Sequence, residues 1–180
     1  MEAWKEKRKN AANCQIQADG FYFPKGYYFK QGMLKRQKSL PFHQIREIRV
    51  NTHPITAITH SKEVIFLKGL KREDIYDWEN KQQIPLIAPQ DNWALICDEF
   101  LDTEYSPEEQ ARTLERLAEK GIGEAEVAQI RKRLKTRMLI RTYVSWEWMY
   151  YGQFEVLTEL WPLNQKKYKW TMDVALRKKE

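Results

Sequence analysis

The first half of the chain shows the alternation of apolar and polar residues that is typical of half-buried strands. Apolar side chains take every second position over 47–50 and again over 55–59, and the apolar run within 63–67 is typical of a central strand. β-forming residues and turn residues alternate at short spacing over 15–23, and the run 27–30 predicts a strand. We interpret 33–39 as a charged strand that could lie at a sheet edge. We therefore expect a strand-rich N-terminal part.

The period of the pattern changes after Gly69. Ile75 and Trp78 lie at helical spacing, which predicts a helix over 70–82 that covers the sheet. Prolines bracket the next segment, and because proline ends helices and restricts the residue before it, we interpret 84–90 as a linker. The chain then divides into a loosely ordered lead-in, a strand-rich domain, the linker and an all-helical domain, at 1–14, 15–83, 84–90 and 91–180.

Local end signals mark the helices of the second half. Asp91 or Asn92 can cap the first helix. The run 106–109 has the composition of a capping box with a proline at the first helical position, and it predicts the start of the next helix. Gly121 is a natural end for that helix, because glycine readily adopts the left-handed conformation. A further helix is expected from residue 124.

Apolar residues cover two faces of the C-terminal part of the stretch 124–161, a pattern that is typical of a buried helix. One unbroken helix over this stretch would be about 57 Å long at 1.5 Å per residue. That length is large for a small domain, so we expect a break near 136–138. The segment 166–178 predicts a last helix that turns Trp170 and Val174 inward.

Two stretches carry a resemblance to a known family. In 40–50 a proline-containing segment directly precedes a strand. In 63–76 a strand ends near Gly69 and is followed by a helix whose first turn contains an acidic pair. In these features residues 15–82 resemble bacterial pleckstrin-homology-type (PH-like) domains. The resemblance implies a curved antiparallel sheet capped by one helix, used mostly to bind proteins, peptides or lipids. The helical part is similar to uncharacterised bacterial sequences, and that similarity implies no activity.

The expected fold is therefore α+β, with a PH-like sheet domain followed by a helical bundle. Hydrophobic residues make up 42% of the 180 residues and aromatic residues 13%, with seven Trp. The chain can therefore fill small cores without the support of disulfide bonds or structural metal ions. Cys14 and Cys97 match no metal-ligand spacing and are expected to be reduced thiols, Cys97 in a buried position. The cationic residues near the N-terminus precede no apolar signal region, and no apolar run is long enough to span a bilayer. We expect a cytoplasmic protein with no membrane insertion.

Charge is unevenly distributed along the chain, although the net charge is +6. Lys and Arg outnumber Asp and Glu by 16 to 9 over 1–85 and by 12 to 7 over 124–180. The segment 86–123 has the opposite balance, with 3 Lys and Arg against 9 Asp and Glu. A nucleic-acid-binding protein more often gathers positive charge on one stripe. This patchwork disfavours nucleic acid as the partner.

A basic and aromatic stretch over 25–38 offers the first candidate binding residues, Lys30, Lys35, Arg36 and Lys38. On a hairpin these side chains could contact phosphates of lipid head groups or of nucleic acid. The alternative, which we favour, is an edge strand that lysines protect against pairing with other chains.

Glu147 is a lone carboxylate in a dense aromatic stretch, with Arg141 among its candidate partners. A buried glutamate must be paired, hydrogen-bonded or neutral, so the residue could be a pocket acid with a raised pKa. The interpretation that we favour is a structural hydrogen-bond hub or an exposed side chain.

Other titratable groups predict no catalytic, metal or cofactor site. Asp98 and Asp102 share one helix face and could bind a cation or act as an acid–base pair, but a solvated face is the favoured interpretation. The three histidines, at 43, 53 and 60, are expected in loops. No phosphate-binding, nucleophile-elbow or metalloprotease motif occurs in the sequence.

The sequence therefore predicts a binding or scaffold module with a protein partner, and self-association through aromatic surface remains open. An enzyme or small-ligand binder with a pocket near Glu147 is an alternative, although the absence of a catalytic motif leans against an enzyme. A second alternative is a binder of anionic ligands through 25–38.

Overall fold

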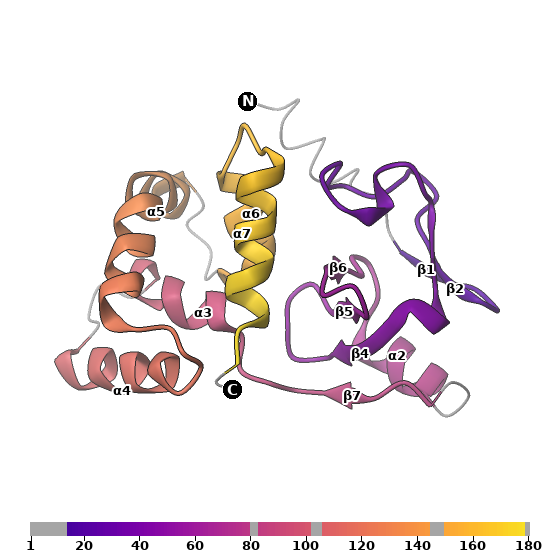
Figure 1. Ribbon diagram of the computed structural model, residues 1–180, viewed down its shortest axis with the longest axis horizontal. Helices are drawn as coiled ribbons and strands as arrows, with labels where there is room; N and C mark the ends of the chain where they lie inside the picture. The colour runs from indigo at the N-terminus through magenta and orange to yellow at the C-terminus, as the bar shows by residue number, and fades with distance from the viewer. Residues whose placement is uncertain (1–13, 80–82, 102–105, 145–149, 179–180) are drawn as a thin grey trace. The chain divides into compact units, whose positions relative to one another are not determined.

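The computed structural model describes residues 14–79, 83–101, 106–144 and 150–178. The chain divides into two compact units, Met1–Pro89 and Gln90–Glu180. The first unit carries two sheets and a helix, and the second is helical in its described residues (Figure 1). The α+β class is therefore confirmed.

Two sheets form the first unit. Strands β1 (Gln15–Ile16), β2 (Gly20–Tyr22) and β3 (Ser39–Pro41) make an antiparallel sheet in that order. The second sheet has the order β6-β5-β4-β7, and its members are listed here along the sheet: β6 (Val64–Phe66), β5 (Thr56–Thr59), β4 (Ile45–Arg49) and β7 (Leu86–Ile87). The strands expected around 47–50, 55–59 and 63–67 are thus present.

The position of β6 differs from the expectation of a central strand, because β6 lies at the edge of its sheet. Its three residues are nevertheless buried. The backbone N–H of Phe66 donates to the Tyr27 hydroxyl at 3.0 Å, so a side chain from a loop satisfies this edge. An edge strand that is covered in this way has the apolar composition of a central one.

The expected strands at 27–30 and 33–39 are wrong. The chain between β2 and β3 is irregular, apart from a short 3₁₀ helix, η1 (Met33–Lys35). Burial still alternates, because Tyr27 and Phe29 are buried while Tyr28 is exposed. The aromatic side chains pack individually into the core, as in the 5.6 Å contact of the Phe29 and Phe66 rings, without a partner strand for the backbone.

The segment interpreted as a linker is also in part a strand. β7 lies parallel to β4, and the Ile48 N–H donates to the Pro85 carbonyl at 2.9 Å. The next bond runs from the Val50 N–H to the Ile87 carbonyl at 3.0 Å. The prolines leave the carbonyls of this segment free to accept, so they do not prevent edge pairing.

The helix α2 (Arg72–Glu79) closes the first unit as predicted, while 80–82 lie outside the described residues. Ile75 is fully buried, and the Trp78 ring lies 4.7 Å from the Phe42 ring and 5.5 Å from the Phe21 ring. Large aromatic side chains therefore fill the space between helix and sheet.

The second unit packs helices around one apolar core. In chain order they are α3 (Asn92–Cys97), η3 (Asp98–Phe100), α4 (Pro107–Ala118), α5 (Glu124–Val144), α6 (Gln153–Glu159) and α7 (Gln165–Leu176). Their start signals act as expected: the Asp91 side chain caps α3, accepting from Trp93 N–H at 2.9 Å, and Ser106 and Glu109 form the capping box of α4. Gly121 has a positive φ of 76° after α4.

The expected break near 136–138 is wrong, because α5 continues through it to Val144. No proline or glycine occurs between 124 and 144, and Leu134 and Met138 are fully buried on one face, so nothing local interrupts the helix. The chain is not helical at 150–152, just before α6. In α7, Trp170 packs on Trp93 at 5.3 Å and Val174 is fully buried, as predicted. None of the helices in the described part of the chain has both the length and the apolar composition of a bilayer span.

Candidate functional site

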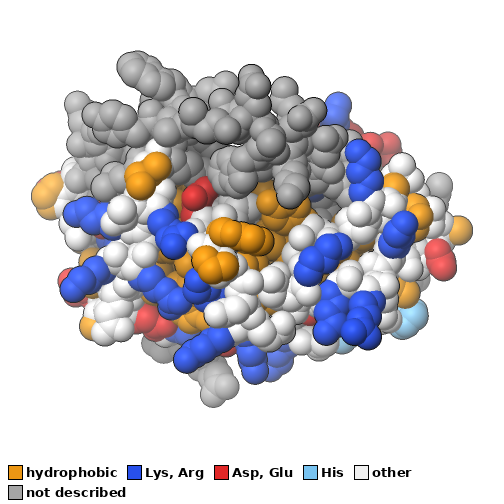
Figure 2. Space-filling model, turned by 90° about the horizontal axis from the view of Figure 1, so that it is seen from above, with side chains coloured by type: hydrophobic (Ala, Val, Ile, Leu, Met, Phe, Trp, Pro, Cys, Tyr) orange, Lys and Arg blue, Asp and Glu red, His pale blue; other side chains and the backbone are white. Residues whose placement is uncertain are grey.

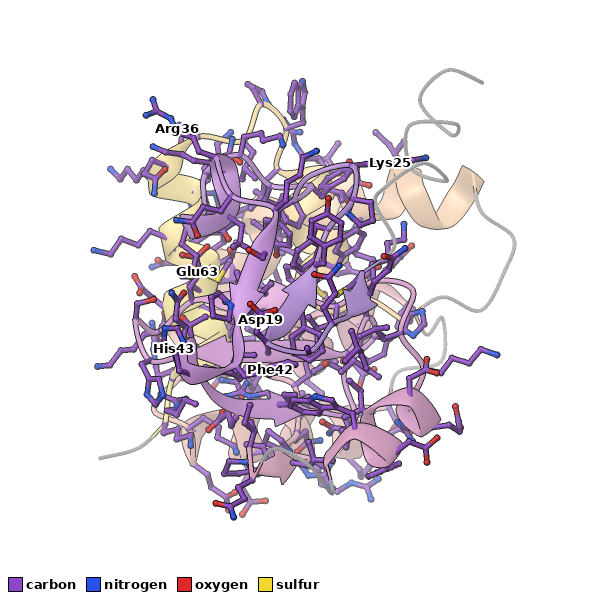
Figure 3. All side chains as sticks on the ribbon, turned by 90° about the vertical axis from the view of Figure 1, so that its right-hand side faces the viewer. Asp19, Lys25, Arg36, Phe42, His43 and Glu63 are labelled. Carbon is purple, nitrogen blue, oxygen red and sulfur yellow. The ribbon has the colours of Figure 1, made fainter. Side chains whose placement is uncertain are left out.

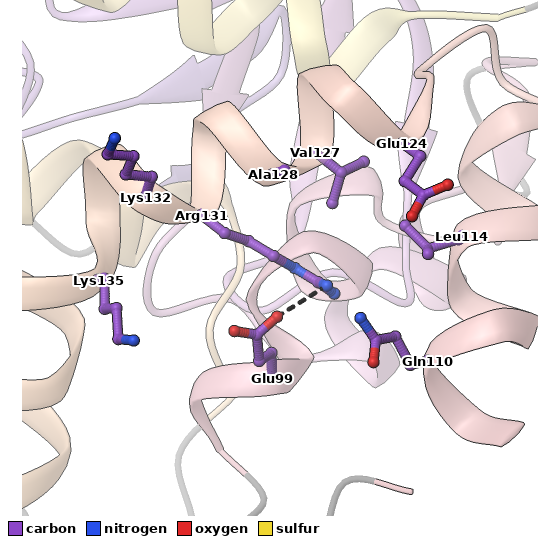
Figure 4. Close-up of a pocket in the computed structure, with 9 residues that line it drawn as sticks. All are labelled: Glu99, Gln110, Leu114, Glu124, Val127, Ala128, Arg131, Lys132 and Lys135. Atoms are coloured by element: carbon purple, nitrogen blue, oxygen red, sulfur yellow. Dashed lines mark ion pairs between the residues drawn. The ribbon is translucent and has the colours of Figure 1, made fainter. Parts of the chain in front are cut away.

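A pocket of about 310 Å³ lies between η3, α4 and α5 in the helical unit (Figure 4). It combines an apolar wall with charged side chains of both signs. The lining residues are Glu99, Gln110, Leu114, Glu124, Val127, Ala128, Arg131, Lys132 and Lys135.

Arg131 is the most constrained polar group of this pocket. It follows Val127 by four positions and precedes Leu134 by three, so it shares the buried stripe of α5 and is only 7% exposed. Its Nε donates to the Ile96 carbonyl at 3.0 Å, and its Nη1 forms an ion pair with a carboxylate oxygen of Glu99 at 2.8 Å. The guanidinium is therefore held in place before any ligand binds, which lowers the ordering cost of binding.

The polar groups of the pocket lie on two sides of this ion pair. Figure 4 shows Gln110 and Glu124, with Leu114, on one side of the Arg131 guanidinium and the two lysines on the other. The Glu99 side chain is 39% exposed, so it remains accessible although it is paired. The pocket thus presents an acidic side towards α4 and a basic side along α5.

The lining offers charged and hydrogen-bonding groups to a ligand. Its polar groups are carboxylates, an amide, a guanidinium and ammonium groups, with no histidine, cysteine or hydroxyl among them. Elsewhere in this unit, Cys97 is fully buried, and burial, followed by the negative charge of Asp91, raises the pKa of its thiol above the usual range. A thiol that stays protonated is a poor nucleophile. Within the described ranges, no group of three or more potential ligands could hold a metal ion.

The four predicted basic residues Lys30, Lys35, Arg36 and Lys38 are all exposed in the β2–β3 segment. They lie on an irregular segment and not on a strand, so the interpretation as a lysine-protected edge strand is wrong. Figure 3 shows Lys25 and Arg36 of this segment pointing outward on opposite sides of the unit.

Only some of the other predicted positions are among the described residues. Arg141 lies in α5, but its side chain and all of Glu147 lie outside the described residues, as does Asp102. Asp98 is exposed, as expected for a solvated helix face. All three histidines are exposed in the first unit. His53 and His60 lie in loops, as expected, whereas His43 lies in a short 3₁₀ helix, η2 (Phe42–Gln44).

The sequence analysis missed the pocket because Glu99, Gln110 and Arg131 come from three separate elements. One signal was present: a cationic residue occupies the apolar stripe between Val127 and Leu134, where it must be buried and hence paired.

A second polar cluster lies at the start of α6. Glu155 is 8% exposed and accepts from the Gly152 N–H at 3.1 Å, and the Tyr150 hydroxyl donates to Asp91 at 2.7 Å. This cluster joins the ends of α3 and α6, and we interpret it as structural.

Figure 2 shows Lys and Arg side chains mostly singly or in small groups on the face in view, with other side chains between them.

The comparisons with known proteins provide no relative from which a function could be transferred. No protein-family model matches the chain, and searches of the curated proteins and of the solved structures found no match. The resemblance of 15–82 to PH-like domains therefore stays a prediction.

Proposed function

We propose that this protein is a binding module and that the pocket between η3, α4 and α5 receives a side chain of a protein partner. The observation that carries the proposal is the buried Arg131 guanidinium, held by the exposed Glu99 carboxylate, at an open and partly apolar pocket. Maintaining a buried guanidinium costs desolvation free energy, and a binding surface is one reason for a chain to retain such a group. We also propose a cytoplasmic location, which the two buried free cysteines support.

A photo-crosslinking amino acid at Gln110 tests this proposal in the cells that make the protein. Gln110 lines the pocket and its side chain is exposed, so the replacement should leave the fold intact. We expect one discrete protein adduct. The matched control is the same amino acid at Glu115, which is exposed on α4 but does not line the pocket.

Filling the pocket provides the second arm of the experiment. Ala128→Trp places a large ring at an exposed lining position of α5 and should abolish the Gln110 adduct. Equal adducts at the pocket and control positions, or an adduct that persists with Ala128→Trp, would contradict the proposal.

A second candidate function is the binding of anionic ligands by the first unit. The segment 24–38 contains five cationic residues and no acidic one, and all five cationic side chains are exposed. The carboxylate of Glu63 accepts from the Met33 N–H through both oxygens, at 2.9 and 3.1 Å, so this neighbouring acid already has a partner. Such a surface attracts phosphates through charge without a shaped site.

Sedimentation with phosphatidylserine vesicles, and separately binding to a single-stranded oligonucleotide, tests this candidate across a salt series. We expect binding that weakens as salt rises and that the double change Lys35→Glu and Arg36→Glu reduces. The same binding by wild type and variant would exclude the segment as the site.

A further inference from the structure

We infer that the pocket selects a basic side chain, lysine or arginine, of the partner protein; this inference rests on the proposed function and specifies its ligand. Three features of the pocket favour a basic side chain: the apolar wall, the hydrogen-bonding groups on the α4 side and the charge of the segment that supplies η3 and α4.

The apolar wall suits the stem of a long basic side chain. Leu114 of α4 faces Val127 and Ala128 of α5 across the pocket (Figure 4). Lysine and arginine bury their aliphatic stems along apolar surface while the charged head remains in a polar environment. A short acidic side chain has almost no stem with which to cover this wall.

The polar groups next to this wall include two carboxylates, which are acceptors, and an amide, which can both accept and donate. Glu99 and Glu124 present carboxylates, and Gln110 adds an amide oxygen, all on exposed side chains. Ammonium and guanidinium groups have only donors, and their bonds to carboxylates are among the stronger hydrogen bonds in proteins. Because Glu99 already compensates the charge of Arg131, Glu124 adds negative charge to this side of the pocket.

The opposite preference, for an acidic ligand, would depend on Lys132 and Lys135. Both side chains are exposed and lie on the far side of Arg131 from Glu124 (Figure 4). The segment 86–123, which supplies η3 and α4, carries nine acidic residues against three basic ones. This negative charge favours the approach of a basic group to the α4 side. The helix α5, with six basic residues against two acidic ones, forms the positive side of the pocket.

Titration of the isotope-labelled full-length protein with single amino-acid amides tests the inference by NMR. The probes are N-acetyl-arginine amide, N-acetyl-lysine amide and N-acetyl-glutamate amide, at millimolar concentrations. We expect the two basic probes, and not the acidic one, to shift the backbone amides of Gln110, Leu114 and Ala128. Glu124→Gln should weaken binding roughly two- to fivefold, as for loss of an exposed ion pair, while Glu115→Gln should not change it.

The outcomes separate this inference from the proposed function. If only the acidic probe shifts the pocket amides, or if no probe does, the basic preference is overturned even where the Gln110 adduct is found. If the basic probes bind and depend on Glu124, the preference stands, and absence of the adduct then counts against the protein-partner function alone. Equal binding of basic probes to wild type and Glu124→Gln also overturns the inference.

Discussion

The Tyr150 hydroxyl donates a hydrogen bond to a carboxylate oxygen of Asp91, 2.7 Å away, although the two residues are 59 positions apart. The other Asp91 oxygen caps α3 by accepting from Trp93 N–H. One carboxylate therefore holds the start of α3 and the segment before α6. Burial, reinforced by the negative charge of Asp91, raises the pKa of Tyr150 above its usual range, so the phenol remains a donor.

Tyr150→Phe removes this donor and keeps the ring. We expect a loss of about 1.5–3 kcal/mol in the free energy of unfolding, as for hydrogen bonds to charged groups. Urea unfolding of the full chain, followed by circular dichroism, measures the loss. Tyr76→Phe is the control, because Tyr76 is 48% exposed on α2 and should change the value by less than about 0.5 kcal/mol. Equal effects of the two changes would contradict the structural role of Tyr150.

Gly152→Ala should destabilise the helical unit through crowding. A Cβ atom at this position would lie 2.6 Å from a Tyr150 ring carbon and 2.9 Å from an Asp91 carboxylate oxygen. We expect a cost of about 1–3 kcal/mol, as for other overpacked sites, in thermal or urea unfolding. Gly123→Ala is a matched control before α5, since a Cβ atom there meets nothing within 4 Å. A similar cost at both glycines would show that helix capping, and not crowding, decides.

Glu47 should make stability dependent on pH. Burial alone would raise the pKa of Glu47, but hydrogen bonds and charges of Arg46 and Arg49 outweigh it and lower the pKa below 4.5. A carboxyl group whose folded-state pKa is lowered contributes its full stabilisation above the unfolded value and loses it as the pH falls. We expect Glu47→Gln to cost about 1–3 kcal/mol at pH 7.

This difference between wild type and Glu47→Gln should narrow as the pH falls below about 4.5, where the wild-type carboxyl becomes protonated. Urea unfolding of both proteins at neutral and acidic pH measures it. A difference that is constant across this range would show that charge on Glu47 does not contribute.

The Arg131–Glu99 pair, with its buried guanidinium, should matter more for stability than the Arg177–Glu126 pair of the same unit, whose guanidinium is half-buried. Arg131 has a side chain that is 8% exposed, whereas the Arg177 side chain, which pairs with Glu126 at 2.6 Å, is 29% exposed. We expect Glu99→Gln to cost about 1–3 kcal/mol, because it leaves a buried guanidinium with less compensation. Glu126→Gln should cost about 0–1 kcal/mol. Urea unfolding measures the loss in the free energy of unfolding for both variants. A larger loss for Glu126→Gln than for Glu99→Gln would contradict the structural role of the Arg131–Glu99 pair.

Both cysteines should resist alkylation in the folded protein. Cys14 is 4% exposed, and burial raises the pKa of its thiol to about 12. Cys97 is fully buried with a raised pKa as well. Iodoacetamide at pH 8, followed by mass spectrometry, should modify neither cysteine in native protein and both in urea, because the thiolate is the reactive form. Rapid modification of native Cys97 would revive an enzymatic interpretation.

Local features of the sequence were sufficient for much of the secondary structure. The alternation around Ile48 and Ile58 predicted β4 and β5, and Ser106 and Gly121 predicted the limits of α4. Each of these signals acts within a few positions, through side-chain alternation or through backbone groups at a helix end. The same reasoning failed for 27–30, where alternating burial exists without a partner strand, since pairing depends on a distant segment.

The candidate site shows the same difference between what local sequence predicts and what tertiary contacts decide, and shows it more clearly. Lys30 and its basic neighbours could be predicted as exposed because charged side chains stay hydrated. Nothing in the local pattern joins Arg131 to the Ile96 carbonyl 35 positions earlier. The pocket forms where the three helical segments η3, α4 and α5 pack against one another.

The sequence by itself therefore determined the class of the fold, the change from strands to helices, and the ends of several helices, since short-range sterics and hydrogen bonding decide them. Only the tertiary structure decided that β7 joins the sheet beside β4, that β6 lies at an edge, and that Glu99 meets Arg131. These features depend on which distant segments pack together and exclude water. Residues that are close in the sequence do not specify that packing.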